Sequence, residues 1–118
     1  MPKSLKSFRY LSFDVVGTLI DFEAGLTDCL AAIAKEAGVA FDGEAALALY
    51  RAARYEPEAM LFPDDLARVY GRIAPKLGLP QDPALGVRLR ESARVWKAFP
   101  DSAAALASLA KHYRLIAM

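Results

Sequence analysis

The sequence predicts an α/β protein in which two strands of one sheet flank an inserted helical cap. Two short apolar runs of strand type stand far apart in the chain, over residues 10–16 and 113–118. Between them, apolar residues recur at steps of three and four, the period of helices that bury one face. We therefore expect residues 1–21 and 98–118 to form the core and residues 22–97 to form the helical cap.

Five helices are expected, over residues 22–37, 43–54, 64–77, 83–96 and 102–110. Asp21 and Asp64 stand where the first and third helices would have their N-caps. Gly38 and Gly78 follow the last turns of the same two helices, and glycine commonly ends a helix. The fifth helix and the final strand return the chain to the core.

The small number of strands is unusual for this fold class. Parallel strands normally belong to larger sheets that are covered on both faces, and a sheet of two strands is marginal. We therefore expect this sequence to be a truncated N-terminal part of a longer protein, or to lack a partner that completes the sheet.

The charge and cysteine content exclude several classes of function. Lys and Arg number 15 and Asp and Glu 14, so the net charge of +1 argues against nucleic acid or a membrane surface as the main partner. Cys29 is the only cysteine, which excludes an intrachain disulfide and fits the cytoplasm. No apolar run approaches the roughly 20 residues of a membrane span. A small-molecule substrate is the expected partner.

The segment that carries chemistry follows the first strand. Asp14 is expected at the carboxyl end of that strand, where open α/β sheets bind their ligands. Gly17 allows a sharp turn and lets its N–H approach an anion, and the Thr18 hydroxyl can orient the Asp14 carboxylate. These features describe a carboxylate nucleophile. On chemistry alone, an Asp and a Thr in an ordinary turn after a strand fit equally well.

The run Asp14-Val15-Val16-Gly17-Thr18-Leu19-Ile20-Asp21 resembles the first motif of the haloacid dehalogenase (HAD) superfamily, Asp-x-x-Gly-Thr-Leu-x-Asp. The resemblance implies a Rossmann-like core with an inserted helical cap. It also implies that Asp14 forms a covalent ester with the substrate, which water then hydrolyses. Family members need a second-motif Ser or Thr, a Lys and later acids, none of which can be assigned here. We therefore expect this chain alone to have little or no activity.

Val16 favours one branch of the superfamily. Family phosphatases usually have a second Asp at this position, which protonates the leaving alkoxide. Val16 has no proton to give, whereas a halide leaves without one, so the sequence resembles the L-2-haloacid dehalogenase branch, which uses no metal or other cofactor. Val15, Val16 and Gly17 would then line the substrate site. The alternatives are a phosphatase that binds Mg²⁺ through Asp14 and the Val16 carbonyl, and a catalytically incomplete fragment that serves as a binding or assembly module.

The expected cap offers a candidate for the halide site. Tyr50-Arg51 resembles the aromatic residue and arginine that lie near the leaving halide in the dehalogenase branch, and Arg54 follows one helical turn later. A cation beside apolar walls suits a substrate that carries a carboxylate and a halogen. The other interpretation is two solvated arginines on a helix. Family dehalogenases often pair, so a homodimer is also an expectation from the resemblance.

Overall fold

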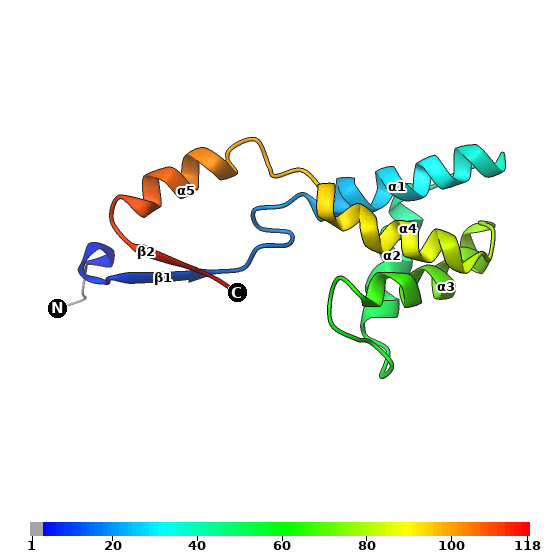
Figure 1. The fold of residues 1–118 in the computed structure, drawn as a ribbon, viewed down its shortest axis with the longest axis horizontal. Coiled ribbons are helices and arrows are strands. Elements are labelled where there is room, and N and C mark those ends of the chain that lie inside the picture. Colours follow the sequence, from blue (N-terminus) through cyan, green and yellow to red (C-terminus); the bar gives the residue numbers. More distant parts are fainter. Residues whose placement is uncertain (1–3) are drawn as a thin grey trace. The chain divides into compact units, whose positions relative to one another are not determined.

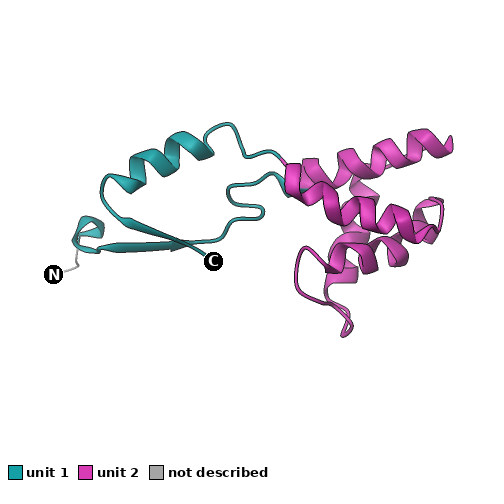
Figure 2. Ribbon diagram, viewed as in Figure 1, with its two compact units in different colours: residues 1–22, 97–118 teal, residues 23–96 magenta. Residues whose placement is uncertain are grey.

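The computed structural model describes residues 4–118, and the chain divides into two compact units. One unit comprises residues 1–22 and 97–118, and the other comprises residues 23–96 (Figure 2). Both ends of the chain therefore contribute to one unit, while the middle of the chain forms the other.

The first unit contains a two-stranded parallel sheet. Strand β1 (Tyr10–Phe13) pairs with β2 (Arg114–Ala117) (Figure 1). Tyr10 lies opposite Arg114 at the start of the ladder. Helix α5 (Ser102–Ala110) precedes β2, and a short 3-10 helix, η1 (Leu5–Ser7), precedes β1. The predicted α/β fold class is confirmed.

The first strand is shorter than the sequence predicts, which is a correction to its expected end at residue 16. The chain turns immediately after Asp14, because the Val15 carbonyl accepts hydrogen bonds from the N–H groups of Leu19 (2.8 Å) and Ile20 (3.1 Å). Val16 and Ile20 then form an isolated bridge. The apolar character of residues 15 and 16 therefore belongs to a turn, in which both side chains are half-buried.

The second unit contains four α-helices, which are α1 (Phe22–Ala37, whose first residue belongs to the other unit), α2 (Gly43–Arg54), α3 (Asp65–Leu77) and α4 (Pro83–Ser92). Their apolar stripes meet in one core, whose largest buried side chains include Leu26, Leu30, Ile33, Leu66, Val69, Tyr70, Ile73 and Leu89. The Asp42 and Asp82 carboxylates accept backbone N–H groups at the starts of α2 and α4 and so cap these two helices.

Two helix ends differ from the prediction. Helix α4 was expected to continue to Trp96, but it ends at Ser92 and a 3-10 segment, η2 (Ala93–Val95), follows. The Ser92 hydroxyl donates to the Leu89 carbonyl (2.6 Å) and accepts from the Trp96 indole N–H (3.1 Å). The predicted cap at Asp64 makes no side-chain bond, because that residue already has helical dihedral angles.

None of the helices within residues 4–118 is both long enough and apolar enough to traverse a membrane.

Candidate active site

Asp14 lies directly after β1, at the carboxyl end of the sheet. Its carboxylate is exposed, and its Oδ2 accepts a hydrogen bond from Thr18 Oγ1 over 3.1 Å. The four-residue spacing allows this bond because the chain reverses between the two residues. The structure therefore brings together Asp14 and Thr18, the two side chains that the sequence suggested as a nucleophile and an orienting hydroxyl.

Gly17 makes the reversal possible. Its φ of +89° lies in the left-handed region, which L side chains rarely adopt. A Cβ at this position would also lie 3.3 Å from the ring of Phe22. The Gly17 N–H donates to the Ile20 carbonyl (2.9 Å), so in this structure it closes the turn.

A second segment of the chain holds the turn from the other side. The Leu19 carbonyl accepts the Phe99 N–H (2.9 Å) and the hydroxyl of buried Ser102 (2.7 Å). The Asp21 N–H donates to the Lys97 carbonyl (2.9 Å), and Ile20 forms an antiparallel bridge with Ala98. Because these bonds hold residues 19–21 in place, they also limit the motion of the turn that presents Asp14.

Ser102 is a residue that the sequence analysis did not select. Its position after Asp101 suggests only the start of a helix, and its partner Leu19 is 83 residues away. No local pattern in the sequence could have identified that bond.

The three residues proposed for the halide site lie on α2, in the other unit. Tyr50 is buried, and burial raises the pKa of its phenol. Arg51 is about half exposed and pairs with Glu23 over 2.7 Å. Arg54 donates to the carboxylate of Asp65 and to the Met60 carbonyl (2.9 Å), so it is held by the chain itself.

Asp65 is the centre of an ion network that the sequence analysis missed. Its carboxylate is 1% exposed and accepts bonds from Arg68 (2.6 and 3.0 Å) and from the Met60 N–H (2.9 Å), besides the bond from Arg54. The hydrogen bonds from Arg68 are the main cause that holds the pKa of Asp65 well below its ordinary value.

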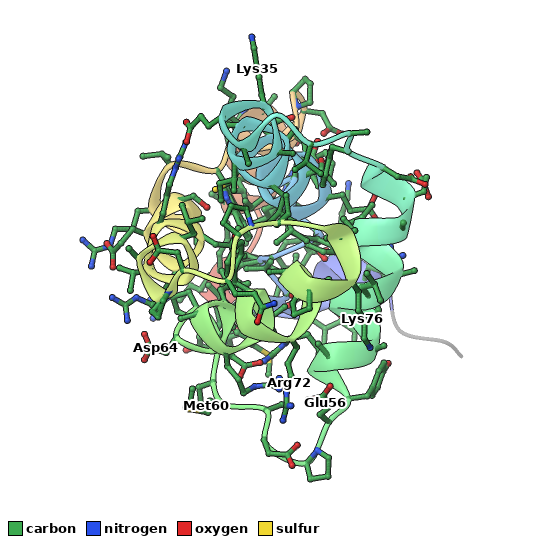
Figure 3. All side chains as sticks on the ribbon, turned by 90° about the vertical axis from the view of Figure 1, so that its right-hand side faces the viewer. Lys35, Glu56, Met60, Asp64, Arg72 and Lys76 are labelled. Carbon is green, nitrogen blue, oxygen red and sulfur yellow. The ribbon has the colours of Figure 1, made fainter. Side chains whose placement is uncertain are left out.

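Glu56 extends this network towards solvent, where it accepts a hydrogen bond from Arg68 (2.9 Å) and forms an ion pair with Arg72 (3.1 Å). Figure 3 shows Glu56 and Arg72 close together, with Met60 on the same side of the unit. The network therefore joins the loop between α2 and α3 to the first two turns of α3, which is a structural role.

No metal site is formed by the described side chains alone. Within residues 4–118, no group of three or more His, Cys, Asp or Glu residues is arranged to hold a metal ion. The chemistry that this turn offers directly is that of an exposed, hydrogen-bonded carboxylate at the end of a parallel strand.

Comparisons with known proteins support the fold. No protein-family model matches the chain, and neither does any curated protein. The solved structures that match include the defluorinating L-2-haloacid dehalogenase Rha0230, with a TM-score of 0.73 and 22% identity over 91% of this chain and 49% of that one. Another is a dehalogenase with a TM-score of 0.73 and 21% identity, over 97% of this chain and 52% of that one.

A third match is the putative HAD-hydrolase YfnB from Bacillus subtilis, solved with magnesium bound. Its TM-score is 0.72 at 16% identity, over 94% of this chain and 53% of that one. This chain thus spans about half the length of each of these proteins. At such identities the likeness establishes the shared architecture.

Proposed function

The chain has the fold of haloacid dehalogenase-like hydrolases, and from this premise we propose that Asp14 is the nucleophile of a hydrolase that works through a covalent ester. An Asp14 oxygen would attack the reacting carbon and expel the leaving group with its bonding electrons. Water would then attack the carbonyl carbon of the ester and release the product. Asp14 would regain its carboxylate, with one oxygen now derived from water.

The hydrogen bond between Thr18 and Asp14 is the observation that carries this proposal. It holds Oδ2 in a fixed direction and leaves the carboxylate exposed, so a substrate can approach it. The Ser102 and Phe99 bonds to Leu19 support the turn from behind. Together they restrict the carboxylate before substrate binds.

We propose hydrolytic dehalogenation of a short 2-haloacid as the reaction. Val16 offers no acidic proton, and a halide is a weak base that leaves without one. In this proposal Arg51 receives the halide, and Val15, Val16 and Gly17 line the substrate site beside Asp14. Two of the matched structures are dehalogenases, which supports the proposal of dehalogenation over phosphate hydrolysis.

A phosphatase is the second candidate, because one matched structure is a putative HAD-hydrolase bound to magnesium. In that case Asp14 and the Val16 carbonyl would be the ligands that this chain supplies. The ion would withdraw charge from the phosphoryl group.

The experiment that separates these proposals uses protein that contains this chain together with the later motifs that the resemblance implies. Halide release from a 2-haloacid and phosphate release from a phosphomonoester are measured with and without magnesium. We expect halide release without magnesium. Phosphate release that requires magnesium would replace the dehalogenase proposal with the phosphatase.

A single turnover in water enriched in heavy oxygen tests the nucleophile itself. We expect the peptide that contains Asp14 to gain one heavy oxygen, and Asp14→Asn to abolish turnover and labelling. Asp28→Asn removes an exposed carboxylate from α1 and is the matched control. Turnover without label in the Asp14 peptide would exclude the covalent ester.

A further inference from the structure

A cavity of about 610 Å³ lies at the amino end of the sheet in the first unit. It is lined by residues 6–10, which lead into β1, and by residues 110–114, which lead into β2. Because the strands are parallel, the two segments that precede them lie side by side. Asp14 follows the opposite end of β1, roughly 13 Å away at the rise of a strand. The cavity is therefore separate from the candidate active site.

The charges that line this cavity all have one sign. Lys6, Arg9, Lys111 and Arg114 contribute cations, and no Asp or Glu is among the lining residues. All four side chains are exposed, and none forms an ion pair with any residue of the described chain, 4–118. We call this place the basic cavity.

The other arginines of the protein behave differently. Every arginine between residues 23 and 96 forms an ion pair with a carboxylate, namely Arg51, Arg54, Arg68, Arg72, Arg88, Arg90 and Arg94. Arg9 and Arg114 are the arginines of the described chain that have no such partner. The protein has 15 basic and 14 acidic side chains, so this local excess does not reflect the overall composition.

The backbone fixes the two arginines near each other. The Arg114 N–H donates to the Arg9 carbonyl over 2.8 Å, immediately before the pairing of Tyr10 with Arg114. Tyr113 Oη donates to the Leu5 carbonyl (3.1 Å), which joins η1 to the start of β2. A multiply charged anion could therefore contact several cations at once without a rearrangement of the backbone.

Two carbonyl groups at the end of α5 are already occupied by hydrogen bonds. The carbonyl end of a helix carries partial negative charge, and α5 ends beside the cavity. However, the Ser108 carbonyl accepts the Lys111 N–H (3.3 Å), and the Leu109 carbonyl accepts those of His112 and Tyr113 (3.0 Å each). Lys111 adds a full positive charge at the same end.

We propose that the basic cavity binds a ligand that carries a chain of phosphate groups. Phosphate oxygens accept charge-assisted hydrogen bonds from arginine and lysine, and arginine can donate two such bonds side by side. Phe8 and Tyr10 are each about half exposed at the same cavity, so they are aromatic side chains on which a planar base could stack. The shared chemistry is the oligophosphate chain, which could come from inorganic polyphosphate or from a nucleoside triphosphate.

The test is titration of the purified 118-residue chain with tripolyphosphate and, separately, with ATP, each without metal. Calorimetry gives the affinity, and amide chemical shifts give the place of binding. We expect saturable binding with shifts concentrated in residues 6–10 and 110–114. ATP that binds more tightly than tripolyphosphate would assign the base to Phe8 and Tyr10, and equal affinities would assign recognition to the phosphates alone.

Three variants that each remove one positive charge make the test specific. Arg9→Gln and Arg114→Gln should each weaken binding by about fivefold or more, since each removes a direct cation. Arg94→Gln removes an exposed arginine that pairs with Glu91 in the other unit, and it should leave binding unchanged. Unchanged amide spectra outside the cavity show that each variant is folded.

Two results would overturn the proposal. One is equal weakening by all three variants, which would show that only net charge matters. The other is a failure of the wild-type chain to bind either compound saturably at low salt, where screening is weakest. Neither result depends on hydrolase activity, so failure here is distinguishable from failure of the Asp14 proposal.

Discussion

The indole of Trp96 packs directly on the backbone of Gly25 in α1. A Cβ on Gly25 would lie 2.4 Å from Cγ of the indole, which is closer than atoms can approach. Trp96 also contacts the ring of Phe62, with 5.8 Å between centroids, and donates its indole N–H to Ser92. The absence of a side chain at Gly25 is therefore what allows Trp96 to join α1 to the end of α4.

Gly25→Ala should destabilise the protein by about 1–3 kcal/mol, because the indole must move away from the new methyl group. The measurement is urea unfolding followed by circular dichroism, and emission of Trp96, the single tryptophan, should shift to the red. Gly71→Ala is the control, since Gly71 lies in α3 with nothing within 4 Å of its Cβ position. It should stabilise the helix by up to about 1 kcal/mol. Equal effects of the two changes would contradict this account.

Asp65→Asn should lower the free energy of unfolding by about 3–5 kcal/mol at pH 7, because Arg54 and Arg68 lose the charge that compensates them. The pKa of Asp65 is lowered in the folded state, so its contribution is complete above the unfolded pKa of about 3.9 and is lost as the pH falls further. Urea unfolding of the wild-type and Asp65→Asn proteins at pH 7, 4 and 3 should therefore show a difference in the free energy of unfolding that becomes smaller below about pH 4. A difference that stays constant over this range would contradict a lowered pKa of Asp65 in the folded state. Asp28→Asn, which removes an exposed carboxylate, is the control.

Ser102→Ala should cost about 1 kcal/mol of stability, because the Leu19 carbonyl loses a buried hydroxyl donor but keeps the Phe99 N–H. The more specific readout is amide hydrogen exchange at Leu19 and Ile20, which should become faster. Ser108→Ala changes an exposed serine on the same helix and should leave that exchange unaltered. Unchanged exchange in Ser102→Ala would show that the turn is held by other contacts.

Arg51→Ala should abolish halide release in the active protein if Arg51 receives the halide. Its effect on stability should stay below about 1 kcal/mol, because the pair with Glu23 is exposed on both sides. Turnover and urea unfolding are therefore measured on the same variant, with Arg94→Ala as an exposed arginine control. Unchanged turnover would remove Arg51 from the mechanism.

The sequence predicted those features that depend on local pattern. The stripe of Leu26, Leu30 and Ile33 located α1, since a helix buries every third or fourth residue. The spacing of Asp14 and Thr18 around a glycine likewise predicted the hydrogen bond at the candidate site. These inferences succeeded because the residues involved are neighbours in the chain.

The features that the sequence did not predict depend on distant partners or on competing hydrogen bonds. Strand β1 ends at Phe13 because the Val15 carbonyl accepts bonds from the turn, which apolar character alone cannot reveal. Arg54 looked available on a helix surface, but its partner Asp65 lies in the next helix. The bond from Ser102 to Leu19 required knowledge of where α5 lies.

The bridge between Ile20 and Ala98 has a consequence for the order of folding. Strands β1 and β2 are about one hundred residues apart in the chain, and closing a flexible loop of that length costs about 4 kcal/mol of entropy. The helices between them make mostly nearer contacts and can form first, after which only short flexible segments separate the two strands. Once folded, residues 23–96 keep Ile20 and Ala98 close together, which favours pairing of the two strands. Any compact unit whose ends meet at this bridge could replace residues 23–96 and leave the strands paired.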